Sequence, residues 1–445
     1  MTTLAYTAID DIPEIRDELR ATFRSGVTRP LEWRKHQLYQ LVRLAQNEAN
    51  AICDALARDF AKPRFENMGD VAWVIERALS SAEKLEEWTK PEHPNVPESQ
   101  RSWKPTIYKA PKGTVLIISP WNYPIILTFQ PLIGAISAGC CAVLKPSEVV
   151  PHFSNLIADL IPKYLDPSAY RVVNGAIPEA SKLLELQWDH IFYTGNGRVA
   201  RIVASAAAKH LTPCSLELGG KSPVYVDSTF DMDLAAKRIL PLTRIYRQIC
   251  VAPDYVLVLR QKQDELIQGF EKAYKAFFPN GALDDVHYGS IVNDMHFQRL
   301  TNLLDRSEGE KVGGVMAGRK NPEKRRFEPI FVKGVKANDS LLEEEIFGPI
   351  LPVVAVDSLN EAIEFVNERP HPLVLYAFTE DPIVKGRLIN ETQSGGITFN
   401  DTVQQLSVAQ LPFSGIGESG HGYQFLSYTF EAFTHLRSSV DIPKE

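Results

Sequence analysis

A long, mostly apolar stretch of the sequence begins Lys112-Gly113-Thr114-Val115-Leu116-Ile117-Ile118-Ser119-Pro120-Trp121-Asn122-Tyr123-Pro124. No residue between Lys112 and Lys145 is charged. A run this long and this apolar could be mistaken for a membrane-spanning helix. Prolines and polar residues interrupt it, however, and proline is poorly tolerated inside a helix. A buried strand over 114–119 followed by a buried helix over 129–138 explains the pattern better. The stretch therefore predicts the first strand and helix of a buried core, and no transmembrane segment.

The alternation of apolar strands and helices continues along the chain from this stretch. Such alternation predicts an α/β fold with a parallel sheet, helices on both faces and ligands at the carboxyl ends of the strands. The expected strands of the first unit are 114–119, 142–145, 171–174, 191–194 and 215–218, and its expected helices are 129–138, 152–164, 180–186 and 197–210. A second unit is expected after Gly220, with strands 223–226 and 255–259, a helix near 233–240 and further alternation to 398.

The segments that flank these units have different patterns. Apolar residues recur every three or four positions over 10–87, which predicts amphipathic helices. The proline-rich segment 91–98 predicts an extended connector or edge arm that leads to a partner subunit. Residues 308–326 predict a surface loop, and the sequence from Asn400 onwards is rich in turn residues.

Composition narrows the class of protein. A chain of 445 residues with 44% hydrophobic and 23% charged residues predicts two globular domains with smaller attachments. A net charge of −7 without clustered Lys and Arg argues against a nucleic-acid partner. The five cysteines form neither a disulfide framework nor a zinc pattern, so we expect a reducing compartment and no metal site. With no secretion signal at the N-terminus, these features favour a cytoplasmic location.

A series of short motifs carries a family resemblance over nearly the whole chain. They are Pro120-Trp121-Asn122-Tyr123-Pro124, Lys145-Pro146-Ser147-Glu148, Phe192-Tyr193-Thr194-Gly195, Leu216-Glu217-Leu218-Gly219-Gly220-Lys221-Ser222-Pro223, Cys250-Val251-Ala252-Pro253-Asp254-Tyr255, Glu344-Glu345-Ile346-Phe347-Gly348-Pro349-Ile350 and Leu411-Pro412-Phe413-Ser414-Gly415. Because these motifs occur in this fixed order, the chain resembles an aldehyde dehydrogenase of the branch that includes the class 3 and fatty-aldehyde enzymes.

The resemblance implies a fold and a division into domains. A Rossmann-type parallel-sheet domain for NAD would comprise 1–90 and 110–214, and an α/β catalytic domain would comprise 215–398. A small oligomerisation arm and bridging segments would comprise 91–109 and 399–445. Members of this branch are commonly dimers, so a homodimer is expected.

The resemblance also assigns the catalytic residues. Aldehyde oxidation needs a thiolate that adds to the carbonyl, donors for the resulting oxyanion and a base that activates water. Cys250 is the expected nucleophile, Glu217 the base, and the Asn122 amide and the Cys250 backbone N–H the oxyanion donors. Most free cysteines are simply buried small hydrophobes, and this interpretation is kept for Cys53, Cys140, Cys141 and Cys214.

The expected cofactor is NAD, with NADP possible. Residues 194–200 join a strand to a helix, where free N–H groups suit a pyrophosphate, although such a segment can also be an ordinary tight turn. By resemblance, Lys145 and Glu148 contact the adenosine ribose, and a carboxylate there would repel a 2′-phosphate. The complete expected cofactor set is Trp121, Lys145, Ser147, Glu148, Thr194, Gly195, Asn196, Val199, Leu218, Gly219, Glu345 and Phe347.

The lead-in to Cys250 departs from the family pattern. The family typically has Asn-Ala/Ser-Gly-Gln before the nucleophile, whereas Ile245, Tyr246 and Arg247 stand here and only Gln248 matches. In one interpretation, Arg244 and Arg247 lower the thiol pKa. In the other, bulky side chains obstruct the substrate or misdirect the Cys250 N–H. A displaced exon boundary would also produce so abrupt a change.

The predicted function is NAD(P)-dependent oxidation of a medium- or long-chain apolar aldehyde to the carboxylic acid, through a cysteine thiohemiacetal and a thioester. One alternative is a catalytically impaired relative that acts as a binding or assembly protein. Another is an acyl-thioester enzyme that uses coenzyme A, although Glu217 favours hydrolysis.

Overall fold

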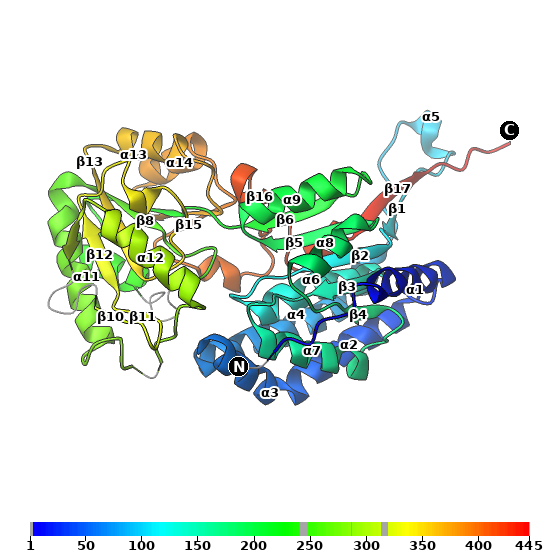
Figure 1. Ribbon diagram of the computed structural model, residues 1–445. Coiled ribbons are helices and arrows are strands. Elements are labelled where there is room, and N and C mark those ends of the chain that lie inside the picture. The colour runs from blue at the N-terminus through cyan, green and yellow to red at the C-terminus, as the bar shows by residue number, and fades with distance from the viewer. Residues whose placement is uncertain (1–2, 241–247, 286, 313–318, 445) are drawn as a thin grey trace.

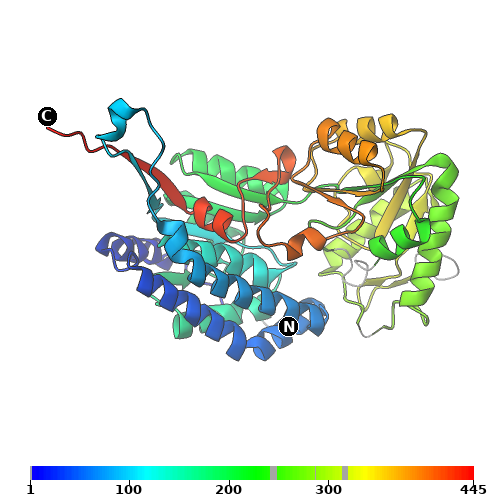
Figure 2. The ribbon, with the colours of Figure 1, turned by 180° about the vertical axis from the view of Figure 1, so that it is seen from behind.

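The computed structural model describes residues 3–240, 248–285, 287–312 and 319–444. It has the predicted α/β architecture, with two large sheets that lie in two lobes (Figure 1). The C-terminal part of the chain runs between the lobes, as the orange and red segments in Figure 2 show. None of the described helices has the length and apolar character that crossing a bilayer requires.

The first sheet is built around the opening strand of the apolar stretch. It has six strands in the order β16-β6-β5-β2-β3-β4, parallel except for β16. Their bounds are β2 (Thr114–Ile118), β3 (Cys141–Lys145), β4 (Tyr170–Val172), β5 (His190–Gly195), β6 (Cys214–Leu218) and β16 (Gly420–His421). Since β2, β3, β5 and β6 are parallel, the residues that follow them meet at one edge of the sheet.

Helices cover both faces of this sheet, as predicted. On one side lie α1 (Asp11–Ser25), α8 (Ile177–Glu185) and α9 (Gly197–Ala208). On the other lie α6 (Pro124–Ala138) and α7 (Pro151–Tyr164), covered by α2 (Leu31–Asn47), α3 (Ala49–Phe60) and α4 (Arg64–Thr89). The predicted amphipathic region 10–87 therefore forms α1 to α4.

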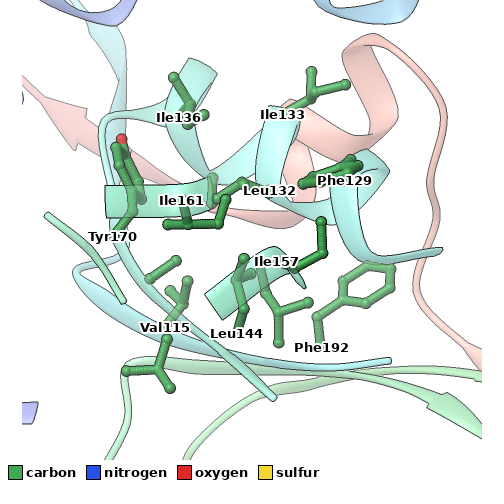
Figure 3. Close-up of a cluster of buried hydrophobic side chains, with 14 of the residues drawn as sticks. Val115, Phe129, Leu132, Ile133, Ile136, Leu144, Ile157, Ile161, Tyr170 and Phe192 are labelled. Carbon is green, nitrogen blue, oxygen red and sulfur yellow. The ribbon is translucent and has the colours of Figure 1, made fainter. Parts of the chain in front are cut away.

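Helix α6 is longer than the sequence predicted. It begins at Pro124 rather than at residue 129, because proline suits the first turn of a helix, where its missing N–H needs no partner. Almost every side chain of α6 is buried. Phe129 and Leu132 lie in one buried cluster with the sheet residues Leu144 and Phe192, whereas Ile133 projects from the side of the helix away from them (Figure 3). This burial explains the apolar stretch without a membrane.

The second sheet has seven strands in the order β15-β14-β7-β8-β13-β12-β9, and only its edge strand β9 is antiparallel to its neighbour. The strands are β7 (Pro223–Val226), β8 (Tyr255–Leu259), β9 (Glu310–Val312), β12 (Ile330–Lys333), β13 (Ile350–Val356), β14 (Val374–Phe378) and β15 (Gly396–Phe399). Its helices are α10 (Met232–Ile239), α11 (Gln263–Phe277), α12 (Asp294–Arg306), α13 (Leu359–Asn367) and α14 (Pro382–Glu391).

The surface loop predicted over 308–326 contains short strands, so the prediction is wrong in part, and residues 313–318 of it lie outside the described residues. Strand β9 lies in it and pairs with β12, and β10 (Lys320–Asn321) pairs with β11 (Arg326–Phe327). Charged side chains are common in short edge strands as well as in loops, so the charged residues of β9 indicate a loop as readily as a strand. The remaining short elements are the 3₁₀ turns η2 (Arg260–Lys262), η4 (Ser340–Leu342), η5 (Gln404–Ser407) and η6 (Gly417–Ser419).

An arm projects from the first lobe (Figures 1 and 2). It contains α5 (Glu98–Arg101) and the antiparallel pair of β1 (Thr106–Pro111) with β17 (Thr434–Ser439), which follows α15 (Ser427–Ala432). The arm and the end of the chain expose large apolar side chains, namely Trp103, Tyr108, Leu436, Val440 and Ile442.

The strand pairing also shows where the predicted domain boundaries lie. The boundary between 214 and 215 falls inside β6, which pairs with β5 along its length. The first sheet therefore extends to Leu218, and β16 returns to it from the C-terminal segment. The boundary between 109 and 110 falls inside β1.

Candidate active site

Cys250 lies in the loop of residues 248–254 that precedes β8, here called the nucleophile loop, and hydrogen bonds hold this loop on both sides of the thiol. The Gln248 side chain donates to the Ser290 carbonyl (3.0 Å) and accepts from the Val292 N–H (3.1 Å). The buried Tyr376 hydroxyl donates to the Val251 carbonyl (2.7 Å). The position of the thiol is thus fixed from Gln248 onwards.

The departures from the family pattern at 241–247 lie outside the described residues. The two interpretations of Arg244 and Arg247, as activating charges or as obstructions, therefore stay predictions.

Asn122 follows β2 and reaches the nucleophile loop. Its side-chain amide, which is buried, donates to the Gln248 carbonyl at 3.1 Å. An Asn amide has two N–H bonds, so one is left to donate to another acceptor. The structure thus brings the predicted oxyanion donor to within two residues of Cys250 along the loop.

Glu217 lies in β6, paired in register with Thr194 of β5. It is only 3% exposed, and neither carboxyl oxygen has a hydrogen-bond partner among the described residues. Burial raises the Glu217 pKa well above its ordinary value; the Gln424 side chain opposes this, but it stands outside hydrogen-bond geometry and offsets little. A buried carboxyl without partners is costly to the fold and is typical of a catalytic group.

A cavity of about 270 Å³ joins Cys250 and Glu217. Most of its walls are apolar, and they come from α4, α6, the nucleophile loop and the C-terminal segment. The apolar lining residues are Trp73, Tyr123, Ile126, Leu127, Leu218, Ile249, Val251, Leu373, Val403, Leu406, Phe413 and Phe425. Thr194 also lines the cavity, so the cavity reaches the carboxyl end of the first sheet.

The thiol is in an environment that disfavours its charged form. The pKa of Cys250 is raised from 9.0 to about 12, mainly by burial and next by the charges of Glu345 and Glu217. The backbone N–H groups of Cys250 and Val251 oppose this shift only in part. Near neutral pH the thiol is therefore protonated in this state, and attack on a carbonyl requires its proton to be removed.

We expect Glu217→Gln to stabilise the fold, and more so at alkaline pH. Because the folded-state pKa of Glu217 lies above its unfolded value, the stability of the folded state falls as pH rises from the unfolded toward the folded pKa. Glutamine has the same shape and cannot ionise. The variant should gain about 1–3 kcal/mol, or about 2–4 °C in Tm, at about pH 8.5 and less at about pH 5. Thermal unfolding at both pH values tests this, and an equal gain at both would contradict it.

Three predicted cofactor residues lie at the carboxyl end of β3. Lys145 ends the strand and forms an ion pair with Glu148 at 2.9 Å, while Ser147 accepts from the Val149 N–H at 3.2 Å. The Glu148 side chain is 40% exposed. The Glu148 carboxylate thus faces solvent beside the sheet edge, where a ribose could bind, while the Lys145 side chain, 5% exposed, is buried next to it.

The predicted phosphate turn joins β5 to α9. The Asn196 side chain caps the helix by accepting from the Val199 N–H at 3.0 Å. Gly195 is required here, because an added Cβ would come within 2.2 Å of the Tyr193 hydroxyl. The turn presents the N-terminus of α9 at the sheet edge, and such an end attracts anions.

The remaining predicted cofactor residues come from both lobes. Trp121 packs edge-on against Phe347, with ring centroids 5.6 Å apart. Gly219, which follows Leu218, faces the Glu345 carboxylate so closely that a Cβ on it would lie 2.3 Å from a carboxylate oxygen. Phe347 itself adopts a positive φ of 51°, which is strained for a non-glycine residue. These contacts bring the residues of the two lobes close together.

The residues at this edge fit a nicotinamide dinucleotide. The Thr194 hydroxyl oxygen is buried and has no hydrogen-bond partner among the described residues, so a polar ligand would satisfy it. A helix N-terminus, the solvent-facing Glu148 carboxylate and two glycines lie along the same edge.

A clamp behind the site was not predicted. Lys221 forms an ion pair with Asp254 and donates to the carbonyls of Leu341 and Glu344, both at 2.9 Å. The other Asp254 oxygen accepts from the Ile346 N–H at 2.8 Å. The clamp therefore joins three of the sequence motifs, and it fixes the segment of Glu345 and Phe347 against the nucleophile loop.

Comparisons with known proteins find similar sequences over nearly the whole chain. The family model described as "Aldehyde dehydrogenase family" matches residues 1–439. The chain is 42% identical over 436 residues to the dimeric NADP-preferring aldehyde dehydrogenase of Canis lupus familiaris, covering 97% of this chain and 95% of that protein. It is 40% identical to aldehyde dehydrogenase family 3 member H1 of Arabidopsis thaliana, covering 95% and 87%.

A solved structure of similar sequence is the substrate-bound state of Staphylococcus aureus AldH. The two chains are 38% identical, and the match covers 96% of this chain and 93% of the other, with a TM-score of 0.93. More distant aldehyde dehydrogenase structures, at 22% identity and a TM-score of 0.89, show the same fold.

Proposed function

The chain belongs to the aldehyde dehydrogenase family and is an NAD(P)-dependent aldehyde-oxidising enzyme, and from this premise we propose that its substrates are medium- or long-chain apolar aldehydes. The observation that carries the proposal is the cavity of about 270 Å³ with Cys250 and Glu217 in its largely apolar wall. An alkyl chain in this cavity would be shielded from water while its carbonyl meets the thiol.

The first step that we propose is addition of the Cys250 sulfur to the carbonyl carbon. The thiol proton leaves to a base, a carbon–sulfur bond forms and the carbonyl oxygen becomes an oxyanion. In this proposal the second N–H of the Asn122 amide and the Cys250 backbone N–H donate to this oxygen, and the hydrogen bond from Asn122 to the Gln248 carbonyl supports the role of Asn122. A nicotinamide nucleotide held by residues such as Glu148, Thr194 and Glu345 would supply the hydride acceptor that converts the thiohemiacetal on Cys250 to a thioester.

Glu217 then activates water. Its carboxylate takes a proton from a water molecule, the hydroxide adds to the thioester carbon, and the cysteine sulfur leaves as the acid forms. The unpartnered Glu217 oxygens support this role, because a carboxylate with no protein donors keeps its proton-accepting capacity. The same observation supports hydrolysis over transfer to coenzyme A. No described residue favours an inactive binding protein.

The cofactor assignment rests on the Lys145–Glu148 pair. The Glu148 carboxylate suits the ribose hydroxyl of NAD, while Lys145, 2.9 Å from it, could attract the phosphate of NADP. We propose that the enzyme accepts both nucleotides.

A homodimer is supported by the exposed apolar residues of the arm, which a second copy could cover. The names of similar relatives also describe dimers. Sedimentation equilibrium that gave a monomer mass at micromolar concentration would reject this proposal.

The test of the substrate class is turnover of straight-chain aldehydes with NAD or NADP, followed by absorbance of the reduced nucleotide. We expect kcat/KM to rise about fourfold per added methylene until the cavity is filled, since each buried methylene contributes about 0.8 kcal/mol. No dependence on chain length would contradict an apolar substrate. A requirement for coenzyme A would show that the thioester is transferred rather than hydrolysed.

A further inference from the structure

The substrate cavity holds a buried cation that the proposed reaction does not use. Arg77 lies on α4, is only 3% exposed and lines the same cavity as Cys250. Burying a guanidinium is unfavourable unless an anion of the protein or of a bound ligand pairs with it.

The protein holds the Arg77 side chain in place with neutral partners only. Its guanidinium donates to the Gln130 amide oxygen at 2.9 Å and to the Leu406 carbonyl at 3.4 Å, and it lies 4.0 Å from the Phe425 ring centroid. The Gln130 amide is itself oriented, because its nitrogen donates to the Thr429 hydroxyl at 2.9 Å. A guanidinium has five N–H bonds, so these two hydrogen bonds leave others to donate.

The neighbouring carboxylates do not neutralise Arg77. Asp70 is committed to a buried ion pair with Lys62 at 2.7 Å, and Glu76 is exposed. No ion pair on Arg77 occurs within the ranges that the structure describes. Burial lowers the Arg77 pKa to about 10, so it still carries its charge at neutral pH.

Arg77 belongs to a different wall of the cavity from the reacting groups. It lies on α4 and bonds to Gln130 of α6 and Leu406 of η5, whereas Cys250 and Glu217 come from the nucleophile loop and β6. The cation thus belongs to the part of the cavity formed by α4, α6 and the C-terminal segment, where the far end of a bound chain would lie.

We propose that Arg77 binds an anionic group at the far end of the substrate, so that the enzyme prefers aldehydes whose apolar chain ends in a carboxylate. The inference rests on the proposed function. A planar guanidinium can donate two parallel N–H bonds to a carboxylate, and a desolvated site makes such bonds strong. An uncharged substrate end would leave the cation buried beside apolar groups.

The experiment compares two substrates of equal length, a straight-chain aldehyde with a terminal carboxylate and its methyl ester. The measured quantity is the ratio of their kcat/KM values. We expect the wild type to favour the carboxylate, and Arg77→Met to lower the ratio about 10- to 100-fold, mainly through the KM of the carboxylate substrate. Arg77→Lys should restore part of the preference. Lys84→Met, which removes an exposed cation from the same helix, should keep the ratio of the wild type.

A structural role for Arg77, bridging α4 to α6 and η5, makes a different prediction. The variant would then lose activity toward both substrates by the same factor, and an unchanged ratio would overturn the proposal. A wild type that preferred the ester would overturn it as well.

A binding measurement separates this inference from the proposed function. In Cys250→Ala protein, the dicarboxylate product should raise Tm more than the monocarboxylate of equal length, and adding Arg77→Met should remove the difference. If this binding preference is found while the wild type oxidises neither aldehyde, the proposed function fails and the anion site stands. If turnover is normal but the preference is absent, the anion site fails alone.

Discussion

Replacing Cys250 by alanine is expected to lower aldehyde oxidation at least about 10³-fold, because the reaction loses the nucleophile proposed for the carbonyl while the rest of the site stays in place. The loop should keep its conformation, since Gln248 and the Tyr376 hydroxyl hold it through atoms that the substitution does not touch. The measurement is reduced-nucleotide formation with a medium-chain aldehyde, accompanied by Tm to show that the variant folds.

Cys214→Ala is the matched control for this prediction. Cys214 begins β6, only three residues before Glu217, but does not line the cavity, so its replacement should leave turnover within about twofold. If the Cys250 variant kept most of its activity, the thiol could not be the nucleophile, and Cys214 would be the next residue to test.

Much of this fold was predictable because its signals are local. The buried parallel strands β2, β3, β5 and β8 are short apolar runs, and a parallel sheet requires such runs because helices cover both of its faces. The start of α6 at Pro124 was less evident, since proline signals a break as readily as a first turn. The pairing of β16 with β6 joins residues about 200 positions apart, and no local pattern predicts such a contact.

The residues of the candidate site also differ in whether local sequence could predict them. The residues after β2, β3, β5 and β6 come together because parallel strands present their carboxyl ends at one edge, so Asn122, Lys145, Asn196 and Gly219 could be grouped in advance. Arg77 could not. It occupies a buried position of an amphipathic helix, where the periodicity predicts an apolar residue, and only the three-dimensional structure shows that this position opens into the cavity.

Gln424 was missed for a related reason. It lies in the turn-rich C-terminal segment, more than 200 positions from Glu217, and its amide oxygen is buried without a partner among the described residues. Its contact with the Glu217 carboxyl exists only because β16 brings this segment back to the first sheet.

Glu217→Gln should separate the two halves of the reaction. Glutamine cannot take a proton from water, so hydrolysis of the thioester should slow by about 10²- to 10³-fold, whereas formation of the thioester needs no water. Mixing the variant with excess aldehyde and nucleotide should therefore give one equivalent of reduced nucleotide per active site and then a slow steady state. Intact-protein mass spectrometry should find the acyl group, and peptide mapping should place it on Cys250.

The result with Glu217→Gln also shows whether Glu217 is the base that removes the Cys250 thiol proton. The Cys250 pKa of about 12 means that a base must act before attack, and Glu217 is one of the two carboxyls that act on the thiol electrostatically. If Glu217 supplied that base, the variant would lose the rapid first turnover as well as the steady state, and no acyl adduct would accumulate. A rapid first turnover with a trapped thioester would leave Glu345, whose pKa is raised to about 8, as the carboxyl placed to take the thiol proton. Undiminished steady-state turnover would instead show that water is activated by a residue other than Glu217.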